Sequence, residues 1–195
     1  MRTKTQLLAL NGIIGGTYAA LTLVASALNL AYGPIQFRFS EALTILPFLF
    51  PGTAPGLILG CFAANLLSPY GPLDVVIGTL ATLLAALVTQ WTDKPWLALL
   101  SPVVFNGILV GGMIAWYEVG FTAKFLPVFG LNALWVALGE AVVVFLLGGL
   151  LLKKAPKNGY LRQTVPKRRK QRFLLPCLCT CVGAAAASLF WFLLL

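Results

Sequence analysis

Histidine is absent from this sequence, and acidic residues are rare, with five among 195 positions. Because histidine is the commonest metal ligand and a frequent general base, its absence removes the usual basis for a zinc site or for acid–base catalysis. Charged residues of both signs make up 10% of the chain, whereas a soluble domain has about 25%. With 59% hydrophobic residues and a mean hydropathy of +0.92, the composition predicts an integral membrane protein with one domain.

Several catalytic motifs are also missing. The sequence contains no P-loop, so ATP hydrolysis by that route is excluded. It offers no nucleophile beside a base and no cluster of metal ligands. Cys61 stands alone in an apolar run, and Cys177, Cys179 and Cys181 are spaced by two, which scatters them around a helix. We therefore expect no enzyme activity, no metal site and no cofactor.

Positive charge is concentrated in one segment. Nine of the fourteen basic residues lie within 153–172, and the other five balance the five acids. Such a segment is typical of a cytoplasmic, headgroup-binding stretch, and the lack of interleaved aromatic residues argues against nucleic-acid binding. We divide the chain into a six-helix membrane domain at 1–152, a basic cytoplasmic segment at 153–175, and a further hydrophobic segment at 176–195 that is a candidate seventh helix.

Apolar runs predict an all-α bundle with six helical segments. A helix needs about 20 residues to cross a bilayer, so the second and third segments are short. We expect these two to be broken or half-embedded, which is tolerated where the backbone lines a cavity inside the protein. The first segment is too long for a signal peptide and is expected to be retained. The predicted segments are 7–32, 39–50, 56–68, 75–90, 96–117 and 125–152.

The distribution of basic residues also predicts orientation. Arg2 and Lys4 precede the first segment, and the basic cluster follows the sixth. Both signals favour the cytoplasm, and an even number of crossings between them satisfies both. We therefore expect a multi-pass protein of the cell membrane with a cytoplasmic N-terminus. The loops at 33–38, 69–74 and 118–124 then face outside.

Polar residues inside the apolar segments predict a binding cavity open to the outside. A charge in hydrocarbon costs about 2.5–3.5 kcal/mol on insertion scales, so intramembrane charges usually have a function. The acids other than Asp93, which lies in a cytoplasmic turn, gather in the outer half of the predicted bundle, with one at mid-depth. This pattern suits a small solute with cationic or hydrogen-bond-donor character. The candidate substrate-binding residues are Arg38, Glu41, Asn65, Asp74, Asn106 and Glu140.

A purely structural role is the alternative for these residues. Arg38 and Glu41 are three positions apart, so on a helix they share a face and can pair with each other. Glu140 can pair with Asn106 or with another helix, because a buried carboxylate needs a partner, a bound cation or a proton. The small residues Gly12, Gly16 and Ala20 raise a similar choice. Their spacing of four allows close helix approach, either within the bundle or to a separate membrane partner.

Three stretches resemble one known family of membrane proteins. PIQFRFSEALTILP at 34–47, PGLILGCFAAN at 55–65 and GPLD at 71–74, together with GE at 139–140, resemble the QueT family. The resemblance covers roughly residues 8–152. It implies a six-helix substrate-binding subunit (S component) of an energy-coupling-factor (ECF) transporter. Such a subunit works with a transmembrane coupling subunit and two cytoplasmic ATPases.

The resemblance also implies a substrate, a queuosine precursor such as 7-aminomethyl-7-deazaguanine. This small molecule is planar, has a guanine-like edge with two donors, and carries a cationic arm. We expect Glu41 and Glu140 to bind it, supported by Asn65, Asn106 and Asp74. One alternative is a stand-alone secondary transporter for another small amine or vitamin-like solute. A membrane enzyme or scaffold is the other.

Overall fold

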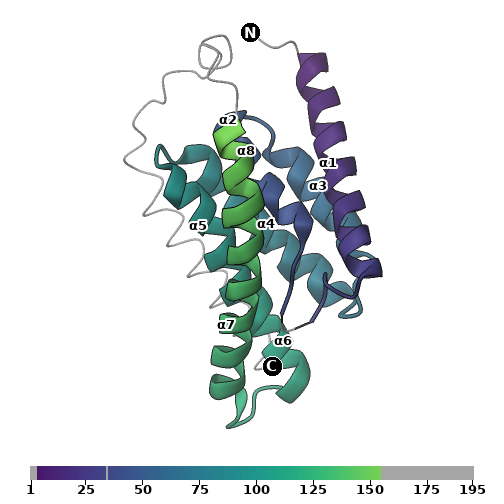
Figure 1. The fold of residues 1–195 in the computed structure, drawn as a ribbon. Helices are drawn as coiled ribbons and strands as arrows, with labels where there is room; N and C mark the ends of the chain where they lie inside the picture. The colour runs from purple at the N-terminus through teal and green to yellow at the C-terminus, as the bar shows by residue number, and fades with distance from the viewer. Residues whose placement is uncertain (1–3, 34, 155–195) are drawn as a thin grey trace. The chain divides into compact units, whose positions relative to one another are not determined.

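Every regular element in the described part of the chain is a helix (Figure 1). The computed structural model describes residues 4–33 and 35–154. The predicted segment 176–195 and the basic residues beyond Lys154 lie outside these residues. The elements are α1 (Lys4–Ala27), the 3-10 helix η1 (Phe39–Ile45), α2 (Leu46–Leu49), α3 (Ala54–Asn65), α4 (Pro72–Trp91), α5 (Pro95–Phe105), the π-helix η2 (Asn106–Val110), α6 (Gly111–Val119), α7 (Phe125–Val143), the π-helix η3 (Val144–Gly148) and α8 (Gly149–Lys154).

Elements that follow one another without a break combine into the six helical segments predicted from the sequence. Four of them are long and apolar enough to cross a membrane: α1, α4, Pro95–Val119 and Phe125–Lys154. The other two, Phe39–Leu49 and Ala54–Asn65, are short, as expected. The all-α, six-helix prediction is therefore confirmed. In Figure 1 the start of α1 and the end of α8 lie at the same end of the bundle.

The first helix ends earlier than the sequence predicted. The apolar run continues to residue 32, but α1 ends at Ala27. Asn29 adopts a left-handed conformation with φ 56°. Its amide donates to Ser26 O, and the amide of Leu30 donates to Ala25 O. This is the hydrogen-bond pattern of a Schellman motif, which ends a helix and reverses the chain. The expected end at residue 32 is therefore wrong, because hydropathy does not register a left-handed cap.

Helices α1 and α3 cross at very short range through glycines. A Cβ atom at Gly60 would lie 2.5 Å from Gly15 O, and one at Gly15 would lie 2.9 Å from Gly56 O. The small-residue contact within the bundle therefore uses this face of α1. Gly12 and Gly16 lie on another face, where an added Cβ would meet nothing within 4 Å, and Ala20 is exposed there as well. Among the described residues, these three positions therefore make no close packing contact with another helix.

Asn11 forms hydrogen bonds at one end of the crossing between α1 and α3. Its Oδ1 accepts a hydrogen bond from the Gly56 amide at 2.6 Å, which caps the first turn of α3. Its Nδ2 donates to Gly52 O at 3.0 Å. The Gly52 amide in turn donates to Gln90 Oε1 at 3.1 Å. Helices α1, α3 and α4 are thereby joined through the turn that precedes α3.

The chain between α1 and η1 is pressed against α7. Within this connection, the Phe37 amide donates a hydrogen bond to Leu30 O at 2.8 Å. A Cβ atom at Gly139 would lie 2.2 Å from Gln36 O, so only glycine permits the approach. Gln36 is itself buried. The connection therefore passes directly beside the α7 residue that follows, Glu140.

We predict that Gly60→Ala lowers the free energy of unfolding by about 1–3 kcal/mol, because a side chain there overpacks the α1–α3 crossing. The matched control is Gly16→Ala, which adds the same methyl group where nothing lies within 4 Å. Unfolding of both purified variants in detergent, followed by tryptophan fluorescence, measures the difference. Equal unfolding midpoints for the two variants would contradict this account of the crossing.

Candidate functional site

Arg38 is buried and fully engaged by neighbouring groups. Its side chain is 3% exposed and forms an ion pair with Asp74, at 3.0 Å from Nη2 to Oδ2. Its Nε donates to Ala31 O at 2.8 Å, and its Nη1 lies 3.5 Å from Asn65 Oδ1. The expected alternative, a pair between Arg38 and Glu41, is not the ion pair that forms. The charge of the guanidinium is instead balanced by an acid from α4.

Arg38, Asn65 and Asp74, which we call the Arg38 group, come from three different parts of the fold. Arg38 immediately precedes η1, Asn65 ends α3, and Asp74 lies in the first turn of α4. Asn65 Nδ2 also donates to Asp74 O at 3.0 Å, so the amide side chain connects α3 to α4. One turn further along α4, a Cβ atom at Gly78 would lie 2.5 Å from Asp74 Oδ1. Glycine at this position leaves the room that the ion pair needs.

A second polar group contains Glu41, Glu140 and the side-chain amide of Asn106. We call Glu41 and Glu140 the carboxylate pair. Asn106 Nδ2 donates to Glu140 Oε1 at 3.1 Å, and the same side chain interacts with Glu41. The Tyr18 hydroxyl donates to Glu41 Oε1. The pairing of Glu140 with Asn106, an alternative raised by the sequence, is therefore present. The hydrogen bonds from Tyr18 and Asn106 use only one oxygen of each carboxylate.

The remaining oxygens of the carboxylate pair have no partner. Glu41 is completely buried and Glu140 is 1% exposed. Four buried side-chain oxygens of the described residues lack a hydrogen bond, and two of them, Glu41 Oε2 and Glu140 Oε2, belong to this pair; the others are Asp74 Oδ1 and Thr79 Oγ1. Buried polar atoms are almost always satisfied in native proteins, so two such atoms in one site call for an explanation. A ligand with hydrogen-bond donors or positive charge would satisfy both.

Two members of this group, Asn106 and Glu140, lie at or near π-helical turns. Pro102 lies inside α5 and lacks an amide hydrogen, and the π-helix η2 begins four residues later at Asn106. In the segment Phe125–Lys154, the π-helix η3 begins four residues after Glu140. π-turns are rare and occur frequently at functional sites. The two side chains that bond to each other thus come from helices that both depart from regular α geometry nearby.

The site is short of positive charge. Arg38 is the only Lys or Arg between positions 5 and 93, and 125–152 contains none. Arg38 is already paired with Asp74, so Glu41 and Glu140 form no ion pair with a basic residue in the described part of the chain. In the described part of the chain, no group of three or more His, Cys, Asp or Glu residues is arranged to hold a metal ion. The arrangement therefore favours an organic cation or a donor-rich ligand.

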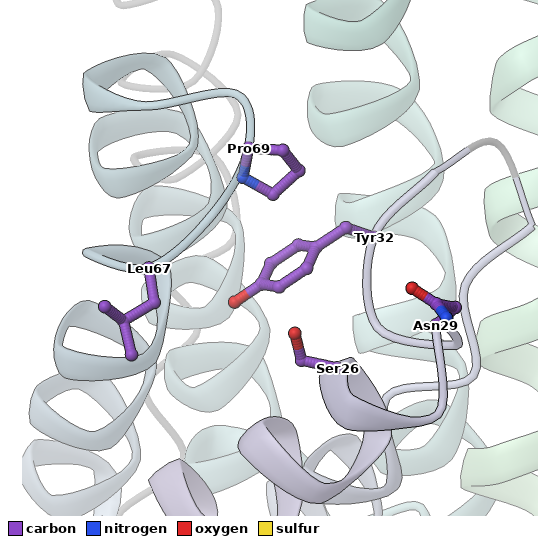
Figure 2. Close-up of a pocket in the computed structure, with 5 residues that line it drawn as sticks. All are labelled: Ser26, Asn29, Tyr32, Leu67 and Pro69. Carbon is purple, nitrogen blue, oxygen red and sulfur yellow. The ribbon is translucent and has the colours of Figure 1, made fainter.

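A pocket of about 340 Å³ lies beside the Arg38 group (Figure 2). Its volume is within the range of about 300–1,000 Å³ that small-molecule sites occupy. Tyr32 lines this pocket and also contacts Arg38, whose Cζ lies 5.1 Å from the ring centroid. The Tyr32 hydroxyl donates to Ala64 O at 3.0 Å. The lining residues are Ser26, Asn29, Tyr32, Leu67 and Pro69.

The structure thus brings all six candidate residues into two adjoining groups, and it adds two that the sequence did not single out. Tyr18 and Tyr32 are both in contact with a candidate residue. Tyr18 could have been found, because it shares a helix face with Asn11 and Thr22, spaced by seven and four. Tyr32 could not, because it lies in the turn beyond α1 where no periodicity applies.

Comparison with known proteins identifies the family. The sequence pattern described as QueT transporter matches residues 8–157. The chain is 27% identical over 165 residues to the queuosine precursor transporter QueT of Lactococcus lactis subsp. cremoris (strain MG1363), which covers 80% of this chain and 96% of that relative. No solved structure matches. With its four helices of membrane-spanning length, this chain is a multi-pass membrane protein and belongs to the QueT transporter family.

Proposed function

We propose that this protein binds a queuosine precursor of the 7-deazaguanine class at the carboxylate pair. The observation that carries the proposal is the pair of unpartnered, buried carboxylate oxygens on Glu41 and Glu140. The name of the L. lactis relative supports the substrate class. The site offers two acceptors and an amide, Asn106, between them.

The chemistry of 7-aminomethyl-7-deazaguanine suits these groups. Its guanine-like edge presents two adjacent donors, and a carboxylate accepts such donors in strong charge-assisted bonds. Its ammonium arm provides the positive charge that the second carboxylate lacks. The amide oxygen of Asn106 can accept a hydrogen bond from the pyrrole N–H, because its NH2 group already serves the carboxylates. The remaining candidates, Arg38, Asn65 and Asp74, are joined by an ion pair and hydrogen bonds that leave only Asp74 Oδ1 without a partner. We assign them to the wall of the site.

We further propose that the protein acts as the S component of an ECF transporter in the cell membrane, with its N-terminus in the cytoplasm. The absence of a P-loop in the sequence supports a role in which ATP is hydrolysed by partner ATPases. The open face of α1 at Gly12, Gly16 and Ala20 supports docking to a transmembrane coupling subunit, because small residues let helices approach closely within a membrane.

If the ligand binds at the carboxylate pair, removing the charge of either carboxylate should weaken ligand binding. Glu41→Gln and Glu140→Gln should each weaken binding of 7-aminomethyl-7-deazaguanine about 10–100-fold, because a hydrogen bond to a charged group contributes about 1.5–3 kcal/mol. Equilibrium binding to the purified protein measures this, with guanine, thiamine and riboflavin as ligand controls.

The matched control variant is Glu118→Gln. Glu118 is exposed and accepts a hydrogen bond from Asn132 at 2.9 Å, outside both polar groups, so its variant should bind like the wild type. Unchanged binding in both Glu41→Gln and Glu140→Gln would place the site elsewhere. Failure of the wild type to bind any deazaguanine would overturn the substrate class.

The docking face predicts a different phenotype. Gly16→Leu should leave ligand binding intact but abolish co-purification with the coupling subunit, because a large side chain blocks close helix approach. The matched control is Gly130→Leu on α7, where an added Cβ also meets nothing within 4 Å. Retained co-purification of Gly16→Leu would exclude this face. Ligand accumulation in vesicles that contain this chain alone would instead favour a stand-alone transporter.

A further inference from the structure

The carboxylate pair presents an electrostatic problem when no ligand is bound. Glu41 and Glu140 are both buried, each has one oxygen without a partner, and η1, which carries Glu41, packs against α7, which carries Glu140. An ionised carboxylate in an apolar interior is costly unless it is paired. Two such groups in one site add mutual repulsion to that cost, as they do in other buried carboxylate dyads.

Within residues 4–33 and 35–154, the groups that face the pair do not resolve this problem. From α1, the Tyr18 hydroxyl donates to Glu41. From α3, the Cys61 thiol packs in one cluster with Tyr18. From the connection before η1, Arg38 lies near both carboxylates but is paired with Asp74 of α4. Helix α5 contributes no titratable side chain, and η2 contributes only the neutral Asn106 amide.

A proton is the smallest positive charge that can occupy the empty site. We propose that the carboxylate pair holds one proton when the site is empty and that a cationic ligand displaces this proton into solvent. The inference rests on the proposed function, because it takes the ligand to be an amine that binds at Glu41 and Glu140. One positive charge enters and one leaves, so the net charge of the buried site is the same before and after binding.

This exchange makes binding of the cation dependent on pH. Protons compete with the ligand for the same pair, so acid weakens binding and base strengthens it. By linkage, release of one proton per ligand changes the apparent dissociation constant about tenfold per pH unit while the ligand remains cationic. Because the two carboxylates interact, the proton belongs to the pair rather than to one residue. A neutral ligand that uses only the donor edge leaves the proton in place.

Calorimetry of the full-length protein tests the exchange. Binding enthalpies are measured at one pH in phosphate and in Tris, whose heats of ionisation differ, and the slope against that heat gives the number of protons released. We expect about one proton for 7-aminomethyl-7-deazaguanine and none for 7-deazaguanine itself, which lacks the amine. Absence of proton release with the amine would overturn the proposal.

Variants separate this proposal from the proposed function. Glu140→Gln retains the size of the side chain but removes one titratable member of the pair, so any residual binding should release no proton. Glu118→Gln should release the same number as the wild type. Should Glu140→Gln fail to fold, the two buffers still decide the question with the wild type. Binding of the amine without proton release overturns the exchange alone, whereas no binding of any deazaguanine overturns the proposed function and the exchange with it.

Discussion

The ion pair between Arg38 and Asp74 is the interaction on which the rest of the site depends. A guanidinium buried to this extent within an apolar bundle needs a paired anion and satisfied donors. Asp74 supplies the charge, and Asn65 and Ala31 O accept further bonds. These partners come from α3, α4 and the end of the turn beyond α1. Pairing Arg38 therefore fixes the connection that leads into η1 and, with it, the position of Glu41.

The same ion pair defines what the other acids can do. With Arg38 neutralised, Glu41 and Glu140 remain as a buried pair that has one amide and one hydroxyl for partners. Stability alone would favour apolar residues at these positions, because unpaired buried carboxylates lower it. Their presence is most simply explained by a ligand that completes the site. Under the proposed function, the Arg38 group provides structural pairing and the carboxylate pair binds the ligand.

Glycines determine how closely the elements around these groups approach. Gly60 and Gly15 bring α1 onto α3, and Gly139 allows the connection before η1 to lie on α7. The shortest approaches at these glycines are to the backbone oxygens Gly15 O, Gly56 O and Gln36 O. The crossing with α3 also uses one face of α1 only, which leaves the Gly12–Gly16 face open.

The sequence by itself determined the membrane class, the six helical segments and the six polar candidates, because hydropathy and the cost of buried charge act along a local stretch of chain. Tertiary structure alone decided the partners. Arg38 and Glu41 are three residues apart and compatible, yet Arg38 bonds to Asp74, which is 36 positions away. The left-handed cap at Asn29 redirects the chain before residue 32, and this bend brings Tyr32 to Arg38. Partner choice depends on where distant backbones cross, and no local pattern of residues encodes those crossings.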